Sequence, residues 1–157
     1  AVLSVEEVPE RFHSRLNAKG KTYRYTVVAS NLPHVFLRNY SHMVSEKLDV
    51  GAMRQAASLL CGTRDFKAFT SARRGKKSTV RTLEAIDIEQ KEDVLTFTFR
   101  GDGFLYHMVR ILMGTLLEVG CGQREPEEMT DIIKSGERAQ AGALVPAKGL
   151  TLVEVRY

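Results

Sequence analysis

The chain has 157 residues, of which 43% are hydrophobic and 27% are charged, and its formal net charge is +4. This size and composition are typical of one folded domain with a sizeable core, and they exclude a disordered or low-complexity protein. The sequence has neither an apolar run of membrane-spanning length nor a signal-peptide pattern, so we expect a cytoplasmic protein without membrane contact.

The predicted elements begin with strands. Tyr23 and Tyr25 alternate with Arg24 in a stretch rich in aromatic and β-branched residues, which is typical of a strand with the two tyrosines on one face. The beginning of the chain resembles an interior strand and lacks an initiator Met, so we expect a part of a longer protein. In chain order we expect a strand at residues 1–5, a connector at 8–15, a strand at 21–28 and a short strand at 40–44.

The middle of the chain is predicted to contain a helix, a loop and a hairpin. Asp49 is a typical N-cap for the helix, and Gly62 is a typical C-terminal stop. Irregular alternation in the first arm of the hairpin indicates a bulge. In chain order we expect a helix at 48–61, a polar turn at 62–69, a mobile surface loop at 70–77 and hairpin strands at 79–88 and 94–100.

An apolar run between Gly101 and Gly120 predicts a buried central helix that includes residues 104–107. Arg110 is the exception in this run. Its guanidinium keeps its charge and is costly to bury alone, so it implies a carboxylate or phosphate partner, either in a site or in a structural ion pair. Gly114 lies one turn further along the same face, where a missing side chain would allow another segment to approach closely.

The remaining elements complete the fold class. Acids in the first turn and a stop near Gly136 predict a helix that starts at 125–128. A short helical piece at 139–142 and a strand at 150–157 follow. The order of elements predicts an α+β fold in which an antiparallel sheet is covered by helices on one face. The other face would be open to a ligand or a partner domain.

The charges are segregated along the chain. Two segments contain basic residues without any acid, whereas acids collect at 84–93 and 118–137. This pattern predicts a positive face for a polyanion, and interleaved aromatic residues favour nucleic acid, although a solvated basic surface without a partner would have the same pattern. The basic residues are Arg11, Arg15, Lys19, Lys21, Arg24 and Arg38 in one segment and Arg73, Arg74, Lys76, Lys77 and Arg81 in the other.

The sequence gives little support for a metal, redox or cofactor site. Cys61 and Cys121 lack the spacing of a metal site or redox pair and are predicted to be reduced thiols in the core. The four histidines are scattered without a metal-binding pattern, and no glycine-rich phosphate loop or dinucleotide motif is present, so no metal or cofactor is expected. Asp65 and Asp102 could act as acid/base carboxylates or could cap local turns.

Five motifs, taken together and in this order, resemble a known family. They are residues 12–15 (FHSR), 21–25 (KTYRY), 62–66 (GTRDF) with Phe69, 104–110 (FLYHMVR) with Gly114, and 149–152 (GLTL). Over about residues 8–157 they resemble the C-terminal domain of the A class of tRNA pseudouridine synthases.

The resemblance implies an enzyme that isomerises uridine to pseudouridine in the anticodon stem-loop of tRNA without metal or cofactor. Its nucleophile would be an Asp in an Arg-Thr-Asp motif of an N-terminal domain, and that motif is absent from this sequence. Residues 1–157 would then be a single C-terminal domain that is inactive alone. Its partners would be tRNA, its own N-terminal domain and, in a homodimer, a second copy.

The resemblance also implies roles for individual residues. Arg110 would pair with the missing Asp, Tyr23 would stack on the extruded uracil and assist proton removal from C5, and Leu150 would line the base pocket. Packing within the sheet is the alternative role for Tyr23. The remaining residues expected to contact the RNA are Asp65, Phe66, Arg24, Arg73, Arg74, Lys76, Lys77 and Arg81. The rival interpretations are a stand-alone RNA-binding module without catalytic activity and a domain that serves mainly for dimerisation.

Overall fold

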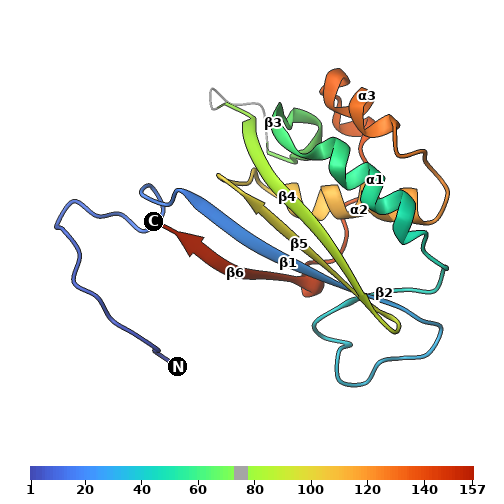
Figure 1. The fold of residues 1–157 in the computed structure, drawn as a ribbon, viewed down its shortest axis with the longest axis horizontal. Coiled ribbons are helices and arrows are strands. Elements are labelled where there is room, and N and C mark those ends of the chain that lie inside the picture. Colours follow the sequence, from blue (N-terminus) through green and yellow to red (C-terminus); the bar gives the residue numbers. More distant parts are fainter. Residues whose placement is uncertain (73–77) are drawn as a thin grey trace.

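A six-stranded sheet with three helices on one face forms the core of the domain (Figure 1). The computed structural model describes residues 1–72 and 78–157. The strands are β1 (Gly20–Ala29), β2 (His42–Val44), β3 (Gly62–Asp65), β4 (Val80–Lys91), β5 (Val94–Gly101) and β6 (Leu150–Arg156). The helices are α1 (Val50–Leu60), α2 (Met108–Gly120) and α3 (Glu128–Ser135), with 3₁₀ turns at Lys67–Phe69, Arg138–Gln140 and Ala147–Gly149.

β1 is the central strand of the sheet. The strand order is β2-β1-β5-β4-β3, and β6 also pairs with β1. One edge of β1 pairs with β5, while the other edge is shared by β6, opposite residues 20–25, and β2, opposite residues 27–29. The pairing of β1 with β2 is parallel and the other pairings are antiparallel. The predicted α+β fold is therefore confirmed, with a mixed sheet in place of a purely antiparallel one.

The inner face of the sheet carries the apolar residues that strand alternation predicts. Tyr25 and Val27 are fully buried and lie opposite Phe97 and Leu95 on β5. α2 covers this face, and every residue of the helix except Arg110 and Glu118 is buried. Burial on all sides explains why this helix is apolar around nearly its whole circumference.

Close backbone packing holds the segment 141–145 against α2. A Cβ atom on Gly114 would overlap the carbonyl oxygen of Ala143, and one on Gly142 would lie 2.6 Å from the backbone nitrogen of Thr115. The backbone N–H of Gly142 donates to Oγ1 of Thr115 at 2.9 Å. The expected close approach at Gly114 is thus present, and the approaching element is the segment that leads to β6.

Several predicted boundaries are confirmed. The side chain of Asp49 accepts the backbone N–H of Ala52 at 2.9 Å as the N-cap of α1, and Gly62 has a φ of +103° just beyond its end. Gly136 ends α3 in the left-handed conformation with a φ of +62°. The expected irregularity in the hairpin lies between Leu83 and Ala85.

Other expectations were wrong. Residues 1–5 are exposed and form no strand, because no described strand pairs with them. The segment 62–65 is strand β3 rather than a turn, since β4 supplies its hydrogen bonds. Cys61 and Cys121 are free thiols but only partly buried, so they are not core residues.

The central helix begins at Met108, four residues later than expected. His107 has a φ of +63°, which is incompatible with a continuous right-handed helix. The carbonyl oxygen of Tyr106 accepts hydrogen bonds from Oγ1 of Thr70 and the backbone N–H of Ser71. These tertiary bonds hold residues 104–107 outside the helix despite their apolar character.

Candidate functional site

The predicted site residues lie on the first turn of α2 and on the neighbouring strands β1 and β6. Tyr23 lies on the inner face of β1, two residues before Tyr25. Its half-buried ring packs edge-on against Phe104, with ring centroids 5.2 Å apart and an interplanar angle of 87°. The packing role considered for Tyr23 is therefore present, and the ring keeps part of its surface exposed.

Arg110 is held by a backbone carbonyl, not by a carboxylate. Its Nε donates to the carbonyl oxygen of Val145 at 2.7 Å. Within residues 1–72 and 78–157 its other nitrogens have no hydrogen bond, and no carboxylate lies within ion-pair distance. The side chain is only partly buried. The guanidinium thus has a fixed position and unused donors, which suits an anionic partner from outside the described residues.

The next residue along the same segment holds Tyr25. The hydroxyl of Tyr25 donates to the carbonyl oxygen of Pro146 at 2.7 Å. A Cβ atom on Gly149 would lie 2.8 Å from the Tyr25 ring, so glycine is required for this close contact. Two adjacent carbonyls, of Val145 and Pro146, therefore fix the cation on α2 and the phenol on β1 relative to each other.

Burial determines which of these groups carries charge. It raises the pKa of Tyr25 well above its ordinary value, and the nearby positive charge of Arg110 opposes this shift only in part. It also lowers the pKa of His107, and Arg110 lowers that pKa further. Tyr25 and His107 are consequently neutral near pH 7, and Arg110 is the cation of the cluster.

Leu150 lies beside this cluster on β6. It pairs with Tyr25 across the strands, and Leu152 pairs with Tyr23. Directly opposite residues of antiparallel strands project from the same face, so Leu150 shares the inner face with both tyrosines. The structure therefore places Tyr23 and Leu150, which lie far apart in the sequence, on the same face as Tyr25, and the charge of Arg110 acts on Tyr25.

Two expected RNA-contacting residues have local structural roles. Phe66 is fully buried and packs against Phe69 with ring centroids 6.0 Å apart, so it has no surface to offer to RNA. The carboxylate of Asp65 accepts the backbone N–H of Lys67 at 3.1 Å and the hydroxyl of Thr79. Asp65 is therefore a local cap, the alternative that its position in a turn suggested.

Of the expected RNA-contacting basic residues, the structure describes Arg24 and Arg81. Arg24 is exposed and lies on the opposite face of β1 from Tyr23, because side chains alternate along a strand. One guanidinium nitrogen of Arg81 donates to the carbonyl oxygens of Ser78 and Val80 in its own segment. Arg73, Arg74, Lys76 and Lys77 lie outside the described residues.

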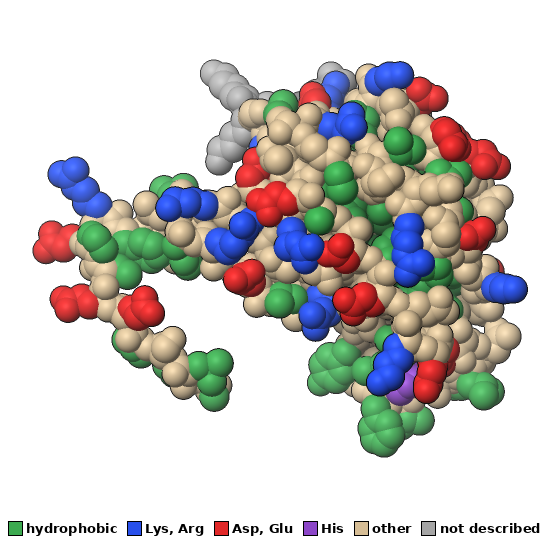
Figure 2. Space-filling model, in the orientation of Figure 1, with side chains coloured by type: hydrophobic (Ala, Val, Ile, Leu, Met, Phe, Trp, Pro, Cys, Tyr) green, Lys and Arg blue, Asp and Glu red, His purple; other side chains and the backbone are tan. Residues whose placement is uncertain are grey.

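The charge segregation seen along the sequence is not maintained on the surface in Figure 2. Lys and Arg side chains alternate there with Asp and Glu side chains over the strands. Ion pairs join Arg100 on β5 to Asp87 on β4, and Arg156 on β6 to Glu84 on β4. The face shown in Figure 2 is therefore not a continuous positive surface, because Arg100 and Arg156 lie beside acids of the segment 84–93.

Tyr106 and His107 belong to the site although they were not among the expected site residues. Their rings stack with centroids 3.7 Å apart and an interplanar angle of 25°. Nδ1 of His107 lies 2.7 Å from the hydroxyl of Ser71. They were missed because they were assigned to the buried helix, and no local signal indicated that the helix starts after them.

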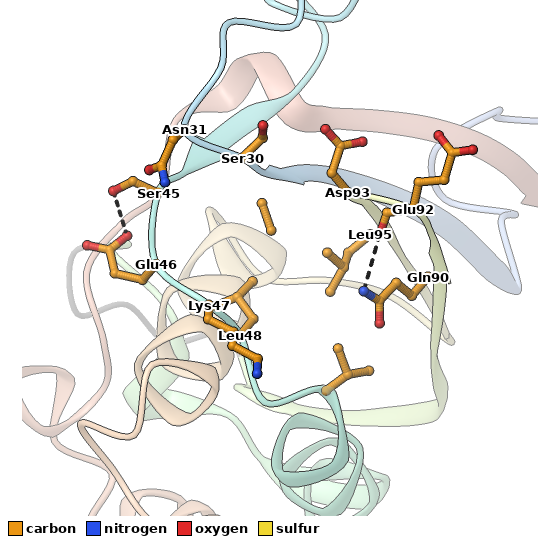
Figure 3. A pocket seen from close by; sticks show the side chains of 12 residues that line it. Ser30, Asn31, Ser45, Glu46, Lys47, Leu48, Gln90, Glu92, Asp93 and Leu95 are labelled. Carbon is orange, nitrogen blue, oxygen red and sulfur yellow. Dashed lines mark hydrogen bonds between the residues drawn. The ribbon is translucent and has the colours of Figure 1, made fainter.

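The structure has two hollows of about 380 Å³ each, of which the first lies away from this cluster and the second borders it at Val145. The first, between the ends of β1, β2 and the β4–β5 hairpin, is lined by the carboxylates of Glu46, Glu92 and Asp93 (Figure 3). These negative charges disfavour a phosphate there. The second hollow lies between β2, α2 and residues 143–145, and its lining likewise contains acids, Glu46 and Glu118.

Residues 1–72 and 78–157 contain no group of three or more His, Cys, Asp or Glu side chains placed to hold a metal ion. Over the same ranges, every helix is too short or too polar to cross a membrane.

Comparison with known proteins identifies the family. The tRNA pseudouridine synthase family profile matches residues 56–157. The chain is 47% identical over 152 residues to tRNA pseudouridine synthase A of Acetivibrio thermocellus, a match that covers 97% of this chain and 62% of that protein. It is 46% identical over 149 residues to tRNA pseudouridine synthase A of Halalkalibacterium halodurans, with 95% of this chain and 57% of that protein covered. The chain thus spans about three fifths of the length of the curated relatives it matches. By the family match, supported by these relatives, the chain belongs to the tRNA pseudouridine synthase family.

Proposed function

We propose that residues 1–157 are the C-terminal domain of a tRNA pseudouridine synthase, an isomerase that converts uridine to pseudouridine in the anticodon stem-loop. The observation that carries this proposal is Arg110, a fixed cation near the inner-face tyrosine Tyr25, with donors that no residue of 1–72 or 78–157 uses. Family membership supports the same activity. The cytoplasmic location expected from the sequence is part of this proposal.

The reaction breaks the bond between N1 of uracil and C1′ of ribose and forms a bond between C5 and C1′, after which C5 loses a proton and N1 carries one. In the proposed site an Asp from a preceding N-terminal domain attacks the nucleotide, and Arg110 pairs with that carboxylate. The unused nitrogens of Arg110 support this pairing. A fixed guanidinium would orient the carboxylate and hold it ionised.

Tyr23 and Leu150 would hold the uracil. A base within a stem is inaccessible until it leaves the stack, so the site must offer an apolar and aromatic surface that replaces stacking. The half-buried ring of Tyr23, fixed by Phe104, and the partly buried Leu150 on the same face offer such a surface. We assign to Tyr23 contact with the uracil and assistance in removing the C5 proton.

The N-terminal domain would cover the edge of the sheet at β6. One edge of β6 pairs with β1, and its other edge pairs with none of the strands in the described ranges. Leu152 and Val153 on this strand are about half exposed. An unpaired strand edge with exposed apolar side chains is a favourable surface for binding another strand or domain. This placement would bring the missing Asp close to Leu150 and Tyr23.

A second copy would bind the loop between β1 and β2. This loop exposes Leu32, Val35 and Phe36, and Figure 2 shows hydrophobic side chains gathered at the place of this loop in Figure 1. We propose that it contributes to a homodimer contact. In the full-length protein Phe36→Glu would then shift the mass measured by light scattering from dimer to monomer, whereas an unchanged mass would exclude this loop from the contact.

The experiment that tests the activity measures pseudouridine formation on an unmodified tRNA transcript. The chain alone is compared with the same chain preceded by its natural upstream sequence. We expect activity only in the longer protein, because the nucleophile is absent from residues 1–157. Activity of the chain alone would contradict the split site. Absence of activity from both, with tRNA still bound, would favour a module that binds RNA without chemistry.

A further inference from the structure

Tyr106 is an exposed aromatic residue with one covered face. Its side chain is 63% exposed, although the ring of His107 stacks on it at a centroid distance of 3.7 Å. Since one face of the ring is covered, the exposed surface must lie on the opposite face and the edges. Burial of this apolar face would be favourable, but no described residue covers it.

Hydrogen bonds with Thr70 and Ser71 hold Tyr106 and His107 rigidly just before α2 begins. His107 adopts the left-handed conformation with φ +63°, which costs a non-glycine residue about 1 kcal/mol or more and persists only where the surroundings enforce it. The hydroxyl of Ser71 contacts Nδ1 of His107 at 2.7 Å, and the hydroxyl of Thr70 donates to the Tyr106 carbonyl at 3.0 Å. A ring fixed in this way loses little conformational freedom when a ligand stacks on it.

The position of the pair links it to the candidate site. Phe104, two residues before Tyr106, packs on Tyr23, and Arg110 follows three residues after His107. Burial and Arg110 keep His107 neutral by lowering its pKa, so the imidazole stacks on Tyr106 as an uncharged ring. The open face is thus an aromatic surface at the edge of a site that is built for an extruded nucleotide.

We infer that Tyr106 is a stacking platform for a nucleobase adjacent to the target uridine, with His107 as the residue that positions it. This inference rests on the proposed function. When one base leaves the stack its neighbours lose a stacking partner, and an aromatic ring restores that contact regardless of base identity. The platform would therefore contribute to RNA affinity without selecting a sequence.

The test uses the full-length protein and an unmodified anticodon stem-loop RNA. Tyr106→Ala should raise the dissociation constant and KM by about 5- to 100-fold, the range expected for one aromatic–base stack, and should leave kcat within a few-fold. Tyr106→Phe keeps the ring and should behave like the wild type. Tyr157→Ala is the matched control, because Tyr157 is also an exposed tyrosine, at 53%, beyond the far end of β6.

A second arm places the contact on the RNA. Single abasic nucleotides are introduced on either side of the target uridine, and binding is measured with wild type and Tyr106→Ala. At one flanking position the abasic change should weaken binding by the wild type but not by Tyr106→Ala, because both changes remove the same contact.

The outcomes separate this inference from the proposed function. Additive losses at every abasic position, or wild-type affinity of Tyr106→Ala, would overturn the platform even if pseudouridine is formed. Affinity, melting temperature and kcat could also fall together in both Tyr106→Ala and Tyr106→Phe. This result would show that Tyr106 has a structural role and would overturn the platform as well. If the wild type forms no pseudouridine, the proposed function fails, while the two binding comparisons still decide whether Tyr106 stacks on a base.

Discussion

Arg110, on α2, and Arg124, which follows the end of α2, differ in the groups that their guanidinium nitrogens contact. Arg124 forms two ion pairs, with Glu118 and Glu128, and has its charge satisfied within the domain. Arg110 uses only Nε, on a carbonyl, and no acid of residues 1–72 or 78–157 neutralises it. This difference separates a structural arginine from one whose partner would come from another part of the protein.

Arg110→Ala in the full-length enzyme should lower kcat by about 100-fold or more, the usual effect of removing one preorganised electrostatic contact. Binding of tRNA should change by a few-fold at most, and the melting temperature should fall only slightly, because Arg110 makes one hydrogen bond within residues 1–72 and 78–157. Arg124→Ala is the matched control and should lower the melting temperature while leaving kcat unchanged. Equal losses of kcat and melting temperature in Arg110→Ala would indicate a structural arginine.

Tyr25→Phe should destabilise the domain by about 1 kcal/mol at neutral pH, since it removes the hydrogen bond to Pro146. The raised pKa of Tyr25 predicts a pH dependence as well. Above about pH 10 the unfolded chain loses the Tyr25 proton while the folded chain retains it, so the free energy of unfolding falls as pH rises. Phenylalanine has no phenol proton, so the free energy of unfolding of Tyr25→Phe does not fall for this reason. Its stability relative to wild type should therefore improve between about pH 8 and about pH 11 in urea denaturation, and a constant difference would contradict the shift.

The sequence singled out Arg110 and Gly114 because each was unusual within an apolar run. The close approach at Gly114 is confirmed, whereas the anionic partner expected for Arg110 is absent from the described residues and its role stays a prediction. Phe66 and Asp65 lie next to each other in a polar segment, yet one is buried in the core and the other caps a turn. The sequence pattern of an aromatic beside an acid does not distinguish these roles from RNA contact.

At the level of elements, α2 and the segment 141–145 form one unit that positions the site. Gly114→Ala would place a methyl group against the carbonyl oxygen of Ala143, and backbone cannot yield as a flexible side chain can. We expect a loss of about 2–3 kcal/mol of stability, since the cost of overpacking exceeds the gain of about 1 kcal/mol in helix propensity. Ala141→Gly, which removes a methyl group from the same segment without overlap, serves as comparison and should be milder in a thermal melt. A variant Gly114→Ala as stable as wild type would contradict the close packing.

Hydrophobic periodicity predicted β1, α1 and the hairpin, because each buries one face, and the long apolar run ending in Gly120 predicted the end of α2. It could not predict β3, whose four residues Gly62–Asp65 are polar or small and mostly exposed. That strand exists because β4 offers an unpaired edge. Nor could it predict that α2 starts at Met108, because this depends on Thr70 and Ser71, which bind the carbonyl of Tyr106.

For the molecule as a whole, the uneven distribution of charge indicates which surfaces would contact RNA under the proposed function. The mixed charges over the strands in Figure 2 make that face a weak binding surface for phosphate. The densest basic stretch of the sequence, residues 73–77, lies outside the described residues. In the sequence it begins two residues after Ser71, which together with Thr70 contacts Tyr106 and His107.

Replacement of Arg73, Arg74, Lys76 and Lys77 by Ala in the full-length enzyme should weaken tRNA binding. The slope of the logarithm of the binding constant against the logarithm of the salt concentration should become shallower by up to about 3 or 4. Each phosphate contact contributes about 0.7 to 0.9 to this slope. Replacement of Lys47, Lys91 and Lys134, which lie near acids, is the control and should leave the slope unchanged. An unaltered slope in the first variant would mean that these four residues do not contact phosphate.

The pairing of β1 with β6 sets the order in which the site can form during synthesis. Tyr25 and Pro146, which share a hydrogen bond, are 121 residues apart, and Leu150 comes later still. A ribosome that has made the helices and the hairpin has therefore not yet supplied the carbonyls that fix Arg110 and Tyr25. Because such distant contacts form slowly and late, a nascent or truncated chain would expose Tyr23 and Tyr25 without organising them. If the proposed function holds, the site would then be complete only after translation has passed β6, and unfinished chains would not compete for tRNA.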